Sequence, residues 1–77
     1  MIDIKNNKTC EKILEYICRG DSNNQIANAM GYATSTITYY IHELLTAYNA
    51  RNRAHLACMF LAKKIKNYQK HKELLEF

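Results

Sequence analysis

The sequence has no proline and only two glycines, Gly20 and Gly31, so a helix can be interrupted at few places. It also has no apolar run that approaches the length needed to span a membrane. Its three cysteines are an odd number without paired metal-ligand spacing; with no signal peptide in view, they favour a reduced cytoplasmic protein. At 77 residues the chain is at most one domain, whose small core would gain from extra burial in a dimer.

Charged side chains are almost missing from the middle of the chain. Residues 1–21 balance four basic against four acidic side chains, and residues 22–50 hold a single charge, Glu43. Residues 51–77 carry seven lysines and arginines against two glutamates, and the whole chain has a formal net charge of +4. A basic C-terminal third suits a polyanionic partner, although many proteins of this charge never bind nucleic acid.

The spacing of the apolar residues predicts four helices and hence an all-α fold. Residues 1–8 lack a helical period and are expected to form a short arm. Ser22 and Gln25 have the spacing of a capping box at the start of the second helix, and Asn49 suits the left-handed end of the third. The expected helices run from about Thr9 to Arg19, from Ser22 to Gly31, from about Thr34 to Tyr48 and from Asn52 to about Lys72.

The second and third helices are joined by the short turn Met30-Gly31-Tyr32-Ala33, which gives them the form of a helix-turn-helix. One stripe of the third helix is expected to face the core, and it consists of Ile37, Ile41, Leu44 and Tyr48. The fourth helix is expected to add Leu56, Met59 and Phe60 to the same core.

The polar side of the third helix faces away from that core. Thr38 and His42 are one turn apart with Tyr39 adjacent, so all three could reach base edges or a thymine methyl group. Ser35 and Thr36, with the free amides of the helix start, suit phosphate oxygens. The same spacing also suits the solvated polar face of an ordinary helical bundle, and the spacing alone does not decide between the two.

Two short motifs are more specific to one family than helical spacing is. They are Thr36-Ile37 and, at a fixed distance further along the chain, Arg51-Asn52-Arg53. With them the chain resembles the LuxR-type (LuxR/GerE) DNA-binding domain over about residues 7–62. The resemblance implies a four-helix LuxR-type helix-turn-helix domain at residues 9–62, with residues 63–77 as a basic and apolar extension of the last helix. The other matching letters are Leu14, Gly20, Ser22-Asn23, Ile26-Ala27, Gly31, Ile41 and Leu45.

The resemblance also implies roles for individual residues, since the family reads bases with the recognition-helix residues after the Thr-Val pair. Of the two adjacent tyrosines, we expect Tyr39 to be exposed, because the match places Tyr40 nearer to the fourth helix. The expected base contacts are Thr38, Tyr39 and His42, and the expected phosphate contacts are Asn23, Thr34, Ser35, Thr36 and Arg51.

The chain departs from the family in its charge. No basic residue lies between Arg19 and Arg51, and other residues stand at five positions of the second and third helices where the family usually carries lysine or arginine. Each lost phosphate contact removes affinity and salt dependence. The positions concerned are Asn24, Thr38, His42, Thr46 and Ala47.

The basic tail at residues 63–72 could flank a duplex or form a solvated helix face. Apolar residues interleaved with its lysines indicate a partner surface, and we expect a homodimer through the C-terminal helix with Leu56, Phe60 and Tyr68 in contact. The histidines and cysteines lack metal-ligand spacing, and the cysteines are expected to be small buried apolar residues. We therefore expect no metal, no cofactor and no enzymatic activity.

Two functions follow from these expectations. The first is a sequence-specific, homodimeric transcription regulator in the bacterial or phage-type cytoplasm, associated with the nucleoid, which inserts its third helix into the major groove of double-stranded DNA. The alternative is a protein-binding adaptor or antagonist that uses the same fold to act on a partner transcription regulator. A nonspecific nucleic-acid coat is a third possibility, and membrane binding is not expected.

Overall fold

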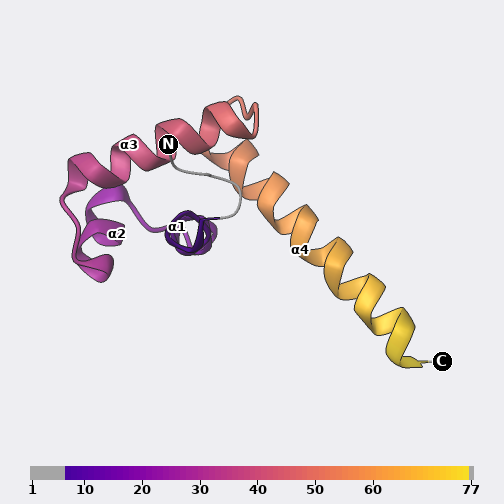
Figure 1. The fold of residues 1–77 in the computed structure, drawn as a ribbon. Helices are drawn as coiled ribbons and strands as arrows, with labels where there is room; N and C mark the ends of the chain where they lie inside the picture. Colours follow the sequence, from indigo (N-terminus) through magenta and orange to yellow (C-terminus); the bar gives the residue numbers. More distant parts are fainter. Residues whose placement is uncertain (1–6, 77) are drawn as a thin grey trace.

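The computed structural model describes residues 7–76, with side chains described through residue 65. The described range forms four helices and no strand, as the sequence predicts for an all-α domain with a long last helix. Figure 1 shows α3 lying across α1 and α2, while α4 starts beside α3 and runs away from the other helices. The helices are α1 (Lys8–Cys18), α2 (Asn23–Met30), α3 (Thr34–Ala47) and α4 (Arg53–Glu76).

One buried cluster joins all four helices. α1 contacts both α3 and α4, and α2 packs against α3. The predicted stripe of α3 is confirmed for its first three members, which are buried, while Tyr48 is half-buried at the C-cap and packs against the cluster. The cluster consists of Cys10, Ile13, Leu14, Ile17, Ile26, Ala27, Ile37, Ile41, Leu44, Leu56 and Phe60.

α1 begins one residue earlier than its apolar spacing indicates, because Asn7 caps it. Asn7 Oδ1 accepts hydrogen bonds from the backbone N–H groups of Thr9 at 2.8 Å and Cys10 at 3.2 Å. An asparagine cap satisfies amides that have no partner inside the helix. At the other end, Gly20 takes a left-handed backbone conformation, with φ at 89°, and the helix stops there.

The predicted capping box and turn of the helix-turn-helix are both present. The Gln25 backbone N–H donates to Ser22 Oγ at 3.2 Å, and the Ser22 N–H donates to Gln25 Oε1 at 2.8 Å. Gly31 ends α2 with φ at 72°, and the Tyr32 N–H reaches back to the Ala27 carbonyl at 2.9 Å. These local bonds fix the direction in which the chain enters α3.

The connection from α3 to α4 also follows the predicted pattern. Asn49 is left-handed, with φ at 53°, and the next amide, Ala50 N–H, donates to the Leu45 carbonyl at 2.9 Å. Asn52 Oδ1 then accepts from the backbone N–H of His55 at 2.8 Å, as expected of the residue that caps α4.

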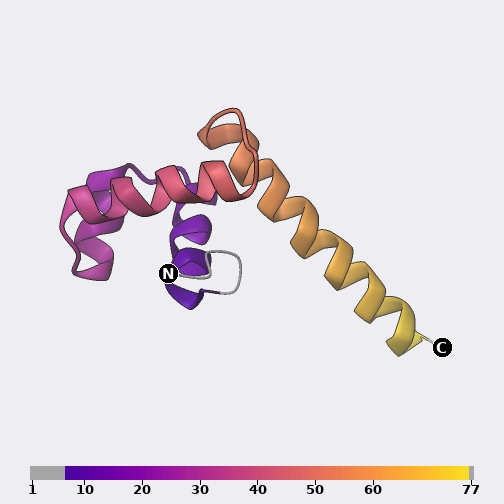
Figure 2. The same cartoon turned by 45° about the horizontal axis from the view of Figure 1, so that its top comes forward.

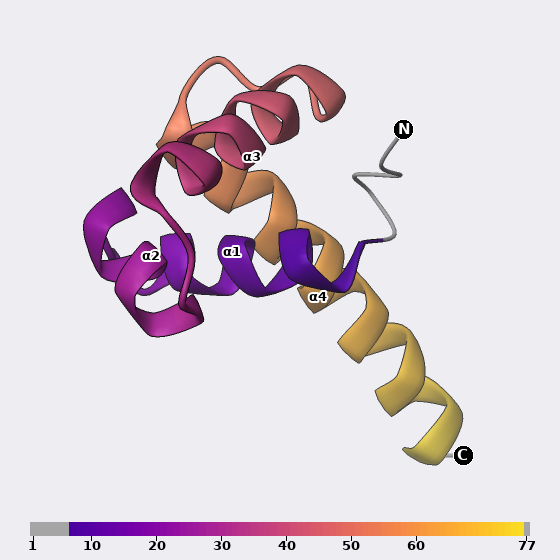
Figure 3. The same ribbon diagram turned by 60° about the vertical axis from the view of Figure 1, so that its left-hand side comes forward.

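The C-terminal half of α4 leaves the other three helices, as Figures 2 and 3 show from two further directions. Near the end of the range whose side chains are described, Lys64 still contacts α1, with its Nζ 3.6 Å from Glu11 Oε1. Beyond the core, α4 exposes two large apolar side chains, Leu61 at 45% and Ile65 at 56%. No helix within the searched part of the chain has both the length and the apolar character to span a membrane.

Candidate nucleic-acid interface

The polar side of α3 is exposed along its first three turns. Thr34, Ser35, Thr38 and His42 are exposed, and Thr36 is half-buried. α3 follows Ala33, and no side chain caps its N-terminus. A helix start without a side-chain cap presents amides and the positive end of the helix dipole, an arrangement that favours an anion. The structure thus brings the predicted base and phosphate residues of α3 to one exposed face.

Thr38 is held by two hydrogen bonds inside the protein. Its Oγ1 donates to the backbone carbonyl of Thr34 at 3.0 Å and accepts from Asn23 Nδ2 at 3.1 Å. Asn23 in turn accepts, through Oδ1, a hydrogen bond from the guanidinium of Arg53. This chain of bonds connects the start of α4 to α3 through the first residue of α2.

A second polar contact joins α2 to the first residue of α3. Thr34 Oγ1 donates to Asn24 Oδ1 at 2.8 Å. Asn24 is one of the positions where the family carries a basic residue, and here its amide oxygen serves as an acceptor within the fold. The two bonds from α2, one at Thr34 and one at Thr38, fasten the first turns of α3 to the preceding helix.

Two arginines near the start of α4 have different surroundings. Arg51, the predicted phosphate contact, is exposed, and its backbone N–H donates to His55 Nδ1 at 3.0 Å. Arg53 is half-buried, and its guanidinium also donates to the carbonyl of Asp21. The sequence pattern marks Arg53 only as a matching letter and does not predict this role. Its position as the first residue of α4 could have indicated a structural role. The sequence did not indicate its partners, because they lie 30 or more residues away along the chain.

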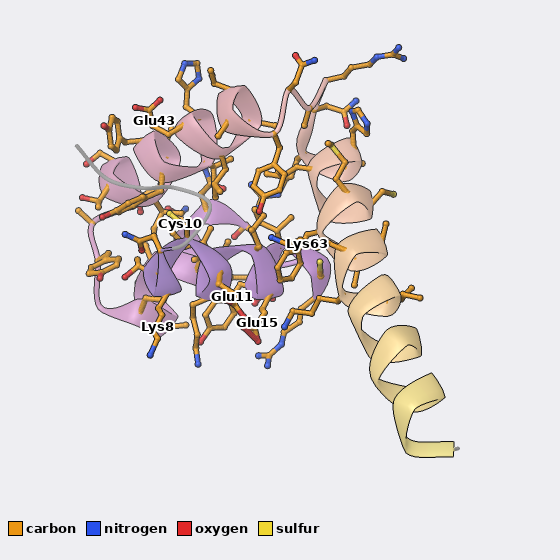
Figure 4. The ribbon with its side chains drawn as sticks, turned by 45° about the vertical axis from the view of Figure 1, so that its right-hand side comes forward. Lys8, Cys10, Glu11, Glu15, Glu43 and Lys63 are labelled. Atoms are coloured by element: carbon orange, nitrogen blue, oxygen red, sulfur yellow. The ribbon has the colours of Figure 1, made fainter. Side chains whose placement is uncertain are left out.

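The exposed face of α3 also carries an aromatic and an acidic side chain. Tyr39 is 54% exposed and Tyr40 packs against the core, as the sequence predicts, with their ring centroids 5.9 Å apart. A hydrogen bond to the side chain of Glu43 and its negative charge raise the pKa of Tyr39 above the ordinary tyrosine value. Figure 4 shows Glu43 on the opposite side of the molecule from the α1 side chains Lys8, Glu11 and Glu15. The α3 face therefore has one negative charge and no lysine or arginine of its own.

The contacts expected for a dimer require a correction. Leu56 is fully buried and Phe60 is 6% exposed, because both pack on the protein's own core, so neither offers a surface to a second chain. Tyr68 lies outside the described side chains. The exposed side of α4 instead presents Cys58, Leu61 and Ile65, spaced by three and four residues.

The three cysteines differ in exposure. Cys10 is buried, as expected, whereas Cys18 is half-buried and Cys58 is exposed, so the expectation of three buried thiols is wrong. Burial raises the pKa of the Cys10 thiol. Burial also raises the pKa of Cys18, whose thiol lies 4.0 Å from the Ala57 carbonyl, with smaller contributions from Cys58 and Glu15. Among the described residues, no group of histidine, cysteine and acidic side chains could hold a metal ion.

The comparison with protein families agrees with this geometry. The family model described as bacterial regulatory proteins, luxR family, matches residues 9–60, which hold α1, α2, α3 and the start of α4. No curated protein matches the chain, and no solved structure matches it.

Proposed function

Since the chain belongs to the luxR family of bacterial regulatory proteins, a family of DNA-binding regulators, we propose that it is a sequence-specific transcription regulator. It acts in the cytoplasm, at the nucleoid, as a homodimer that places α3 of each subunit in the major groove of double-stranded DNA. The observation that carries this proposal is the exposed face of α3, whose first turns are fastened to α2 through Thr34 and Thr38. A recognition helix must be held rigidly for its side chains to meet defined bases.

The residues of α3 divide into two groups in this arrangement. Thr38, Tyr39 and His42 lie one turn or less apart on the exposed side and contact base edges. Thr34, Ser35 and Thr36 surround the uncapped helix start and hold phosphate oxygens. Thr34 and Ser35 do so through their backbone amides, and Ser35 and Thr36 through their hydroxyls, because the Thr34 hydroxyl already donates its proton to Asn24. Phosphate contacts fix the register, and base contacts supply the sequence preference.

Positive charge reaches the DNA from beside α3. Arg51 is exposed on the loop before α4 and forms a phosphate contact. Asn23, which is uncharged, adds a phosphate contact through its backbone N–H at the start of α2, since both ends of its side-chain amide are bonded to Thr38 and Arg53. Because α3 has no lysine or arginine, the number of neutralised phosphates is small. The logarithm of the binding constant falls with the logarithm of salt concentration by about 0.9 per phosphate neutralised, so the total slope should be small.

The dimer forms through the exposed side of α4. Cys58, Leu61 and Ile65 follow the three-four spacing of a helix pair, and two of them are large apolar side chains exposed in the single chain. Pairing of two α4 helices about a two-fold axis would set two α3 helices against half-sites separated by one DNA turn, about 34 Å. The element bound should accordingly have two-fold symmetry.

The direct test is selection of DNA fragments from the protein's own source at physiological salt, followed by sequencing of what is retained. Enrichment of a short, two-fold-symmetric element is the expected result. His42→Ala should reduce that enrichment, and Arg51→Ala should reduce the salt slope by about 0.9 per subunit. Lys8→Ala is the matched charge control, since Lys8 lies on the opposite side of the molecule from Glu43 (Figure 4). A folded protein that retains no preferred sequence would contradict the proposal.

One observation favours a second function, a protein-binding adaptor that acts on a partner regulator. The α3 face lacks basic side chains, while α4 exposes Leu61 and Ile65. An adaptor would keep its protein partner when Thr38 or His42 is replaced by alanine, and would lose it when the chain is cut after Lys64. A regulator would bind its selected DNA element more weakly in the first pair of variants.

A further inference from the structure

The hydroxyl of Thr38 has no proton left to offer a ligand. Its proton is donated to the carbonyl of Thr34 at 3.0 Å, and its oxygen accepts from Asn23 Nδ2 at 3.1 Å. A threonine hydroxyl carries a single proton. While these two bonds hold, Thr38 cannot donate to the acceptor groups of a base or to a phosphate oxygen.

Arg53 determines which end of the Asn23 amide faces Thr38. A guanidinium only donates hydrogen bonds, so the Asn23 oxygen must face Arg53 and the amide nitrogen must face Thr38. The second bond of Arg53, to the carbonyl of Asp21, holds the guanidinium in place. Turning the Asn23 amide over would direct its donors at the donors of Arg53. The orientation of Asn23 therefore follows from the chemistry of Arg53.

The branch of Thr38 without a polar partner is its methyl group. The side chain is exposed, and a β-branched residue in a helix has few allowed χ1 rotamers. Exchanging the methyl and hydroxyl positions would break the bonds to both Thr34 and Asn23. In the major groove, the apolar group that a methyl can meet is the 5-methyl group of thymine.

We propose that Thr38 determines specificity by contacting the 5-methyl group of a thymine through its own methyl group, and that Asn23 and Arg53 are positioning residues that hold it in that orientation. The inference rests on the proposed function and assigns the chemistry of one of its base contacts. It also assigns to Arg53 a role that does not involve touching DNA.

Two substitutions at Thr38 separate a methyl contact from a hydroxyl contact. Thr38→Val keeps both the shape and a methyl at this place but has no hydroxyl. Thr38→Ser keeps the hydroxyl and its two partners but has no methyl. A methyl contact predicts that the valine variant binds the selected element and the serine variant binds it more weakly, whereas a hydroxyl contact predicts the reverse.

The methyl group on the DNA side of the contact can also be removed by itself. Each thymine of the selected element is replaced in turn by deoxyuridine, which lacks only the 5-methyl group. One replacement per half-site should weaken binding by the wild-type protein about 4-fold, the factor equivalent to the ~0.8 kcal/mol of one buried methylene-sized group. The valine variant should show the same ratio of thymine to uracil affinity, and the serine variant should show a ratio near one.

The positioning role has its own measurement. Asn23→Ala and Arg53→Met should lower the thymine-to-uracil ratio, because the Thr38 hydroxyl then keeps only its bond to the Thr34 carbonyl and loses the donor that fixes it from α2, while the salt slope stays unchanged. An unchanged ratio with a reduced slope would instead make Arg53 a phosphate contact and overturn its positioning role. Thr46→Val is the matched control: Thr46 Oγ1 also bonds the carbonyl four residues earlier, at 3.2 Å, and its side chain has no bond to α2.

The outcomes also separate this inference from the proposed function. Wild-type protein that shows no sequence preference overturns both. Selective binding that survives Thr38→Ser and is lost in Thr38→Val overturns the methyl contact and leaves the regulator standing. Selective binding to an element in which no thymine is sensitive to uracil replacement likewise overturns the methyl contact alone.

Discussion

The side chains of Asn52 and His55 each accept a backbone hydrogen bond at the start of α4. The His55 backbone N–H donates to Asn52 Oδ1 at 2.8 Å, and His55 Nδ1 accepts from the backbone N–H of Arg51 at 3.0 Å. The pair resembles a capping box whose returning bond reaches one residue further back than usual. It orders the loop that carries Arg51.

This cap gives a first prediction, on stability. Asn52→Ala should cost about 1 kcal/mol of unfolding free energy, because the His55 N–H loses its acceptor, whereas Asn52→Ser, which keeps an oxygen acceptor, should cost only about a few tenths. Urea unfolding followed by circular dichroism measures both. Asn28→Ala, at an exposed position of α2, is the control and should change little. Equal losses for the alanine and serine variants would show that the side-chain cap is not the cause.

Substitutions at two adjacent residues of α4 should have different effects on the stability of the fold and on dimerisation. Phe60→Ala removes a ring from the core and should destabilise the single chain by about 3–5 kcal/mol. Leu61→Ala should leave the stability of the single chain within about 0.5 kcal/mol and weaken self-association. Thermal unfolding and sedimentation equilibrium measure the two effects. A Leu61 variant that dimerises as well as the wild type would place the dimer contact elsewhere.

The thiols should react with an alkylating reagent in order of exposure. At concentrations low enough for the single chain to predominate, Cys58 should be modified first, Cys18 more slowly, and Cys10 only after unfolding, since the thiolate is the nucleophile and burial raises the pKa of Cys10 and Cys18. Mass spectrometry after timed alkylation, with and without urea, gives the order. In the proposed dimer Cys58 is also the thiol that oxidation should cross-link between chains, with Cys58→Ser as the control. Modification of folded protein at Cys10 would contradict its buried position.

The pair Tyr39 and Glu43 predicts a dependence on alkaline pH. The hydrogen bond to Glu43 raises the pKa of Tyr39, so the neutral phenol is favoured in the folded state. The stabilisation is present below the ordinary tyrosine pKa and is lost as the pH rises through the higher pKa of the folded state. Glu43→Gln should move the ionisation of Tyr39 to lower pH, measured by absorbance with Tyr39→Phe identifying its contribution. No movement in that variant would mean that Glu43 is not the cause.

The features predicted from sequence are those fixed by neighbours in the chain. The Ser22–Gln25 capping box, the left-handed Gly31 and Asn49 and the helical stripe starting at Ile37 all depend on residues within about one or two turns. Adjacent helical residues cannot share a face, so one of the two neighbouring tyrosines had to be exposed, and the family resemblance indicated that it is Tyr39.

The features that were missed depend on distant partners. The bonds of Arg53 to Asn23 and Asp21 join residues whose proximity exists only after folding. Leu56 and Phe60 were correctly placed in the core, but they were also assigned to a dimer because an apolar stripe does not reveal which surface covers it, and the structure shows α1 and the core in that place. A local exception is Asn7, whose cap on α1 was missed because residues 1–8 are polar and lack a helical period.

Arg53 is the first residue of α4, and the bond it donates to Asn23 ends, one contact later, on α3. In the proposed dimer, α4 pairs the subunits and α3 contacts DNA, and the hydrogen bonds of Asn23 thus connect these two helices. Binding free energies linked in this way are reciprocal: the factor by which pairing tightens the hold on DNA equals the factor by which DNA tightens pairing. Asn23→Ala breaks this connection and should reduce both factors equally. Dimerisation would then strengthen DNA binding less, and DNA would strengthen dimerisation less by the same amount.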